Sequence, residues 1–302
     1  MAALMSLSRN TVEDGKQLDL FQARPGAMPL RDTRDLMSYP FFSLAKSPRV
    51  KPIDFRMGEI VIRVEATLEH GMATIWDADV LIWAASQIVD ARDHGLKTSR
   101  HMAATPHEIL TYIGRDTSAR DYRGFKAALD RLQSTTVATS IRQVTGRRMH
   151  RFSWINEWKE RVDGRGRPRG VELILPDWFY AGVMADTFVL TIDRAYFDLT
   201  GGLERWLYRL VRKHGGRQKH GWSFDFRHLY LKSGSLSPFK RFAFELRNIV
   251  HLQPLPGYRL AIQDEPGRGS LLTFKPIPSD PRRPPAAKNG CGHAVDKLWT
   301  ST

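Results

Sequence analysis

SARDYRGFKAALDRLQ, residues 118–133, is the stretch of sequence that decides the fold. Its large apolar residues recur every three or four positions, which predicts an amphipathic helix with one buried face; they are Tyr122, Phe125, Leu129 and Leu132. The opposite face is basic and otherwise nearly free of bulk, with Gly124 and Ala127 between the charges. Arginines can bind phosphates and base edges, and small residues let a helix backbone approach DNA closely. We therefore expect a DNA-binding helix whose contact residues are Arg120, Arg123, Lys126 and Arg131.

The segments around this helix predict the rest of a winged helix-turn-helix, in which a β-hairpin wing follows a helix pair. Thr105 and Glu108 have the spacing of a capping box around Pro106, so an earlier helix begins there. Ser118 is the expected N-cap of the second helix. Two β-rich segments, residues 135–143 and 150–158, then flank a basic turn. Basic wings usually contact the phosphate backbone, although Arg-rich turns also occur on plain solvated surfaces; the expected contacts here are Arg142, Arg147 and Arg148.

Residues 237–252 (SPFKRFAFELRNIVHL) predict a second recognition helix. Arg and Lys can read guanine edges, and Asn can read adenine through two hydrogen bonds. Phe244 faces away from the apolar side, so it either contacts thymine methyl groups, forms a wedge between bases, or packs against another part of the protein. The expected DNA contacts on this helix are Ser237, Lys240, Arg241, Phe244, Arg247, Asn248 and His251, and on the hairpin that follows it they are Arg259 and Arg268.

This order of elements occurs twice, so we expect an α+β fold of two tandem winged-helix domains with flexible N- and C-terminal tails. The expected parts are a flexible arm at residues 1–38, a first domain at 39–165, a second domain at 166–279 and a disordered basic tail at 280–302. The boundary depends on the run DGRGRPRG, residues 163–170, which has the composition of a linker. The same run could equally be the tip of a long hairpin, because the strand predicted after it needs a partner.

The charge of the chain points to a polyanionic partner. The 302 residues include 46 Lys+Arg against 32 Asp+Glu, giving a formal net charge of +14, and the pI is about 10.1. Hydrophobic residues make up 42% of the chain, which is enough for a folded core. Nucleic acid is the first candidate for the partner. The alternative is a basic surface that only keeps the protein in solution.

The motifs of an enzyme are missing, and no catalytic residue, metal or cofactor is expected. The sequence has neither a dinucleotide-binding GxGxxG after a strand, nor an HExxH, nor a paired-histidine nicking motif. Asp77 and Asp79 open a helix predicted over residues 77–93 and are explained as its cap and dipole partners. A single cysteine, Cys291, and the lack of a long apolar run or signal peptide lead us to expect a cytoplasmic protein that does not bind a membrane.

Several uncommon short sequence motifs follow one another between Tyr39 and Ser235. They include YPFFSLAK at residues 39–46, ATIWD at 73–77, LPDWF at 175–179, LTID at 190–193 and ERWLYR at 204–209. Together they resemble the replication initiator protein A family of bacterial plasmids. The resemblance is weaker after Ser235, so the second recognition helix depends more on its residues than on the family.

The resemblance implies a plasmid-encoded initiator that binds the double-stranded replication origin, often at direct repeats called iterons. It implies two winged-helix domains, opening of adjacent DNA, and recruitment of the host initiator and helicase. It also implies a homodimeric form that represses the protein's own gene, and association with plasmid DNA in the bacterial nucleoid. The family has no catalytic residues to carry over to this chain.

A transcriptional repressor without initiator activity is the alternative function. Such a protein would bind an operator and nothing more. Two winged helices in one chain favour the initiator, because many repressors have one such domain per subunit and dimerise. A DNA-processing enzyme is a third class, which would need a metal or nucleophile constellation that the motifs above do not provide.

Overall fold

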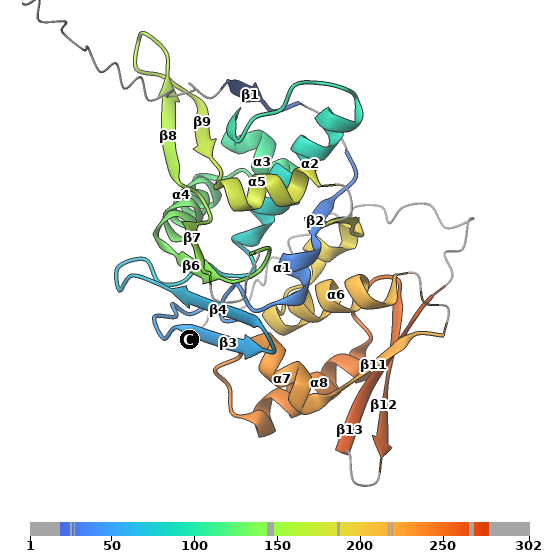
Figure 1. Ribbon diagram of the computed structural model, residues 1–302. Coiled ribbons are helices and arrows are strands. Elements are labelled where there is room, and N and C mark those ends of the chain that lie inside the picture. The colour runs from blue at the N-terminus through green and yellow to red at the C-terminus, as the bar shows by residue number, and fades with distance from the viewer. Residues whose placement is uncertain are drawn as a thin grey trace, which may run out of the picture.

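The computed structural model describes residues 19–24, 26, 28–143, 148–185, 188–216, 218, 220–265 and 269–277. The fold is α+β, as the sequence predicts, and its helices and sheets are distributed along the whole described chain (Figure 1). None of the helices in these ranges is both long and apolar enough to cross a membrane.

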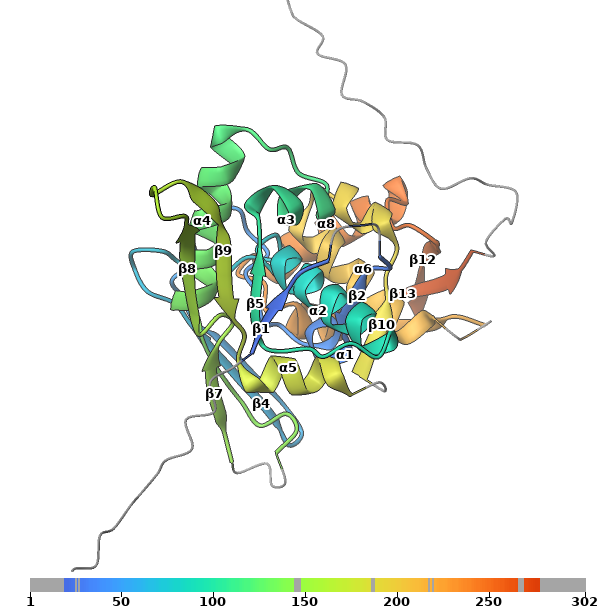
Figure 2. The same cartoon turned by 90° about the horizontal axis from the view of Figure 1, so that it is seen from above.

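One four-stranded sheet has the order β1-β5-β9-β8. Its strands are β1 (Leu20–Gln22), β5 (His101–Ala104), β8 (Glu157–Val162) and β9 (Pro168–Ile174). Strands β5, β9 and β8 pair antiparallel, and β1 adds to β5 in parallel. Its helices are α2 (Ala78–Asp93), α3 (Pro106–Tyr112), α4 (Ala119–Ser134) and α5 (Asp177–Met184). Helix α2 lies at the centre of the molecule (Figure 2) and is buried on nearly every side.

The predicted capping boxes form and fix the starts of α3 and α4. Thr105 Oγ1 accepts a hydrogen bond from the Glu108 backbone N–H at 3.1 Å, and the Thr105 N–H donates to the Glu108 carboxylate at 2.8 Å. Ser118 and Asp121 form the same reciprocal pair ahead of α4. Phe125, Leu129 and Leu132 are fully buried, so α4 points its predicted apolar stripe into the core.

A second sheet, of order β3-β4-β6-β7, corrects one predicted element. Its strands are β3 (Ile53–Met57), β4 (Ile60–Glu65), β6 (Thr136–Thr139) and β7 (His150–Ser153). The hairpin expected after α4 does form, because β6 pairs with β7. However, β6 also pairs with β4, and β7 ends at Ser153 rather than continuing to Trp158. This hairpin therefore belongs to a different sheet from β5, the strand that precedes the helix pair.

The run at residues 163–170 is a hairpin tip, which decides between its two interpretations. Strands β8 and β9 pair antiparallel on either side of it, from Glu157↔Ile174 to Val162↔Pro168. Asp163 closes the turn, since one carboxylate oxygen accepts the backbone N–H groups of Arg165 and Arg167, both at 2.9 Å. A boundary between residues 165 and 166 would cut this hairpin. The expected limit between residues 279 and 280 stays a prediction.

A three-stranded sheet of order β11-β13-β12 lies in the C-terminal half. Its strands are β11 (Trp222–Asp225), β12 (Tyr258–Glu265) and β13 (Gly269–Pro276), and its helices are α6 (Gly202–Gly215), α7 (Phe226–Ser233) and α8 (Phe239–Leu252). The order helix, strand, helix, helix, strand, strand occurs as α6-β11-α7-α8-β12-β13, and it occurs as α2-β5-α3-α4-β8-β9 once the inserted strands β6 and β7 between α4 and β8 are set aside. In both sets the first strand lies next to the last one. The β8–β9 and β12–β13 hairpins project at opposite ends of the molecule (Figures 1 and 2).

The N-terminal segment is packed from residue 20 onward, so the expected flexible arm does not extend to residue 38. Strand β1 buries Phe21, β2 (Arg31–Thr33) pairs with β10 (Val189–Thr191), and α1 (Arg34–Ser38) follows directly. A 3₁₀ helix at Arg194–Asp198 then leads toward α6. The composition of this segment gave no sign of these pairings because their partners are distant in sequence.

Buried ion pairs join the two repeated sets of elements. Asp79 of α2 accepts two hydrogen bonds from Arg205 of α6, at 2.8 and 2.9 Å, and one from Arg115 at 3.0 Å. Asp32 of β2 binds Arg209 of α6 at 2.7 Å. Burial raises the pKa of Asp79, while the guanidinium groups of Arg205 and Arg115 oppose that shift. Asp79 lies in the first turn of α2, as predicted for a dipole partner, and it is also a buried structural partner of arginines.

Candidate nucleic-acid interface

The outer face of α4 is open at the residues the sequence singled out. Arg120 and Arg123 are exposed, and so are Gly124 and Ala127. A Cβ added to Gly124 would meet no atom within 4 Å outside its own stretch of helix, so no other described part of the chain covers this helix backbone. The centre of this face could approach a DNA backbone closely, with two arginines beside it.

The other two cations predicted on α4 have partners within the protein. Arg131 donates two hydrogen bonds to Asp77, at 2.8 and 2.7 Å, and this contact raises the pKa of its guanidinium. Asp77 also accepts from the Thr74 backbone at 2.8 Å and makes no capping bond to α2, which corrects its predicted role. Lys126 forms an ion pair with Glu160 of β8. Arg131 is thus held in a buried pair rather than free for DNA.

The basic residues predicted on the β6–β7 hairpin are dispersed. Arg142 is folded inward, with its guanidinium 3.8 Å from the Trp178 ring centroid and 2.9 Å from the Asp35 carboxylate. Its backbone has a φ of +61°, which turns the chain at the end of β6. This position does not support the predicted DNA contact, because the Arg142 guanidinium is largely removed from solvent and its charge is already paired with Asp35. Arg148 is exposed, and Arg147 lies outside the described residues.

Three arginines that were not among the expected contacts occupy the β8–β9 hairpin tip. Arg165, Arg167 and Arg169 are all exposed, and of their guanidinium groups only that of Arg169 pairs with a carboxylate of the described residues, Asp163 at 3.3 Å. Their alternation with glycine was visible in the sequence. The sequence allows both a linker and a hairpin tip here, because local composition does not show which strands pair on either side.

The outer face of α8 carries the expected polar residues and one exposed aromatic ring. Lys240, Asn248 and His251 are exposed, and no hydrogen bond or ion pair engages their side chains within the described chain. Phe244 is 62% exposed, so the described residues leave most of its surface uncovered. These four residues form a continuous surface on turns of one helix, which we call the α8 outer face.

The remaining predicted residues around α8 are partly engaged. Arg241 binds Glu245 at 3.0 Å on the same helix. Arg247 donates to Ser270 at 3.2 Å and lies 5.2 Å from the Phe226 ring centroid. The Ser237 carbonyl accepts from the Tyr230 hydroxyl at 2.9 Å. Arg259 is exposed on β12, and Arg268 lies outside the described residues.

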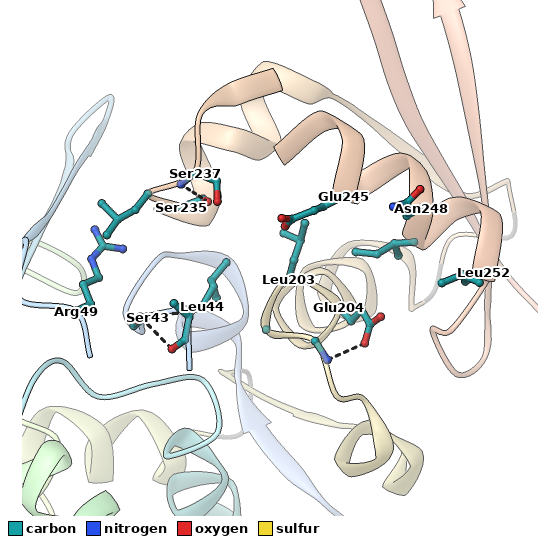
Figure 3. Close-up of a pocket in the computed structure, with 15 residues that line it drawn as sticks. Ser43, Leu44, Arg49, Leu203, Glu204, Ser235, Ser237, Glu245, Asn248 and Leu252 are labelled. Atoms are coloured by element: carbon teal, nitrogen blue, oxygen red, sulfur yellow. Dashed lines mark hydrogen bonds between the residues drawn. The ribbon is translucent and has the colours of Figure 1, made fainter. Parts of the chain in front are cut away.

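A cavity of about 330 Å³ opens beside α8 (Figure 3). It is bounded by the segment 43–45, the N-terminus of α6 and the start and side of α8. Figure 3 shows Glu245 and Asn248 on α8 on one side, with Leu203 and Glu204 of α6 below them. Its lining residues are Ser43, Leu44, Ala45, Arg49, Gly201, Gly202, Leu203, Glu204, Ser235, Leu236, Ser237, Glu245, Asn248, Ile249 and Leu252. Two predicted DNA-contact residues, Ser237 and Asn248, thus lie at this cavity.

The sequence matches a protein family and a curated protein. The family described as replication initiator protein A matches residues 31–260. A curated protein of Wigglesworthia glossinidia brevipalpis, provisionally named a replication protein, is 30% identical over 228 residues, which are 74% of this chain and 82% of that protein.

Two solved structures share the fold. One contains domains 2 and 3 of RctB, with a TM-score of 0.58 and 15% identity, and it covers 80% of this chain and 98% of that one. A second RctB structure of domains 2–3 has a TM-score of 0.51 and 14% identity, covering 77% and 92%. At these identities the likeness concerns the fold alone.

Proposed function

The chain belongs to the replication initiator protein A family, and on that premise we propose that it binds the double-stranded replication origin of a plasmid at iteron repeats. In this proposal it helps to open the adjacent DNA and recruits the host initiator and helicase. A homodimer represses the protein's own gene. The protein acts by binding and has no catalytic activity of its own.

We further propose that each repeated set of elements is a winged-helix unit. In such a unit the second helix of the pair enters the major groove, and the hairpin contacts the flanking backbone. This assignment makes α4 and α8 the recognition helices, and it makes β8–β9 and β12–β13 the wings. The repeated strand order, with β5 beside β9 and β11 beside β13, supports it.

The α8 outer face is the observation that carries the proposal. Lys240, Asn248 and His251 are exposed donors and acceptors without partners in the described chain. Asn can bind adenine through two hydrogen bonds, and Lys can bind guanine. A helix face that serves only solubility has no need for an exposed phenylalanine among these groups.

Footprinting on the DNA that flanks the protein's own gene tests the function. An initiator protects several repeats at helical-turn intervals, whereas a simple repressor protects a single palindrome. The double variant Lys240→Ala/Asn248→Ala should lose protection of the repeats while it keeps weak, salt-sensitive binding to any duplex. Protection of one palindrome alone would contradict the initiator function. Identical footprints from the unaltered protein and the double variant would contradict the proposed role of α8 in base recognition.

A further inference from the structure

The cavity beside α8 lies next to the most exposed aromatic ring of that helix. Phe244 and Asn248 are four residues apart, so they are neighbours one turn apart on the same side of α8. Asn248 lines the cavity, and Phe244 is 62% exposed just before it. A bare aromatic ring and a recess are therefore adjacent on the surface proposed to face DNA.

The side chains of the cavity do not suit a phosphate. Glu204 and Glu245 both line it, and carboxylates repel an anion. Arg49 is its only cationic lining residue among those described, and three of its five N–H donors are already used by the carbonyls of Lys51, Pro52 and Gly234, at 2.8, 3.1 and 2.6 Å. The occupant must therefore be neutral or cationic.

The same side chains suit a flat ring with an amino group. Leu44, Leu203 and Ile249 give apolar contact surface. Glu204 accepts one hydrogen bond from the Gly201 N–H at 2.9 Å, and Glu245 accepts one from Arg241 at 3.0 Å. A carboxylate has about four lone-pair sites, so both retain free acceptors. The Asn248 amide adds a donor and an acceptor, and the volume lies at the low end of the roughly 300–1,000 Å³ typical of ligand sites.

We propose that this cavity receives a nucleobase extruded from the bound duplex, with Phe244 as the wedge that fills the space it leaves. The base would be adenine, because its exocyclic amine can donate to a carboxylate and because the amine and a ring nitrogen together match the acceptor and donor of the Asn248 amide. Apolar side chains inserted between base steps unstack them, and proteins that extrude a base hold it by contacts to its edge and faces. This inference rests on the proposed binding of duplex DNA through α8, and it gives the protein a means of starting to open the helix.

Fluorescence of 2-aminopurine tests the inference. A duplex selected by the full chain from a random library carries the analogue at each protected adenine in turn, and DNA binding is followed separately by gel shift. Extrusion predicts an increase of about threefold or more at one position when the protein saturates the duplex, because the analogue brightens on unstacking. Permanganate reactivity of an opposing thymine should rise at the same step.

Three variants separate the wedge, the cavity and ordinary affinity. Phe244→Ala should bind at saturation with no increase in fluorescence. Leu252→Trp should also abolish the increase, because it fills the mouth of the cavity from a position that is 68% exposed and so tolerates bulk. Lys240→Ala is the matched control, since it lies on the same helix outside the cavity. It should weaken binding but keep the increase at saturation.

The outcomes distinguish this inference from the proposed function. Duplex binding with unchanged fluorescence at every protected position overturns base extrusion and leaves the function standing. An increase that survives in Leu252→Trp overturns the cavity as the receptacle. No sequence-selective binding by gel shift overturns the proposed function and this inference together.

Discussion

Helices α4 and α8 occupy the same place in the two repeated sets of elements, yet they use their polar residues differently. On α4, Arg131 is paired with the buried Asp77 and Lys126 with Glu160, whereas Arg120 and Arg123 have no hydrogen-bond or ion-pair partner among the described residues. On α8, the outer face keeps Lys240, Asn248 and His251 without partners in the described chain. Helix α4 thus combines a structural role with backbone contact, whereas α8 is equipped to distinguish bases.

The two repeated sets of elements also differ in how their buried charged side chains are paired. Around α2 and α4 each buried carboxylate has an arginine, as with Asp77 and Asp79. Lys232 of α7 is 6% exposed and forms no ion pair with a carboxylate of the described residues; its Nζ lies 4.9 Å from the Tyr39 ring centroid. The N-terminal set is therefore held by paired charges that also reach α6, and the C-terminal set depends more on apolar packing. The predictions below test this contrast.

Asp79→Ala should have the largest effect. It leaves Arg205 buried with its main partner removed, and breaking a buried ion pair typically costs about 3–5 kcal/mol. Thermal or chemical unfolding would measure the loss. Asp54→Ala is the control, because its partner Arg63 is 3.3 Å away at an exposed site, where such a pair contributes about 0–1 kcal/mol. Equal stability of both variants would contradict a structural role for the buried pair.

Arg131→Ala and Arg123→Ala should separate the two roles of α4. Arg131→Ala should lower the free energy of unfolding by about 2–3 kcal/mol, because Asp77 is 2% exposed and would lose its cation. Arg123→Ala should leave stability within about 0.5 kcal/mol and weaken DNA binding. Denaturation and gel-shift titration of both variants measure this. If Arg131→Ala weakens DNA binding without lowering stability, Arg131 contacts DNA as the sequence predicts.

Asn248→Ala should weaken binding to the cognate sequence by about 1–3 kcal/mol and relax the base preference at one position. Its side chain is exposed, so the melting temperature should hardly change. Competition with duplexes substituted at single positions measures the preference. An equal loss of affinity for all sequences would mean that Asn248 contacts the DNA backbone. In that case α8, like α4, would contribute backbone contacts rather than base recognition.

Arg165→Ala and Arg167→Ala should have the smallest effects, mainly on the salt dependence. Each removed phosphate contact should lower the slope of log affinity against log salt by about 1, equally for all sequences. Lys97→Ala removes the same charge near the start of β5, which pairs with the end of β9 away from the tip. A salt slope that changes in Lys97→Ala but not in the tip variants would place the wing elsewhere.

Local patterns predicted the helices well and the long-range pairings poorly. The capping boxes at Thr105 and Ser118 form because both partners lie within one helical turn. The pairing of β6 with β4 and of β9 with β5 depends on segments whose side chains give no register signal across the intervening chain. The same holds for Arg131 and Arg142, whose acidic partners are 54 and 107 residues away, so a helical wheel overstates the charge available to DNA.

The N-terminal segment has a consequence for how the protein is made. Asp32 is joined to Arg209, 177 residues later in the chain. At a synthesis rate of about 5–20 residues per second, the ribosome needs roughly 10–35 s to produce Arg209 after Asp32. The first packed segment to emerge therefore waits for α6 before it can close its buried ion pair. During that interval a nascent chain offers β2 to other partners, so slowing translation before residue 209 should lower the yield of folded protein.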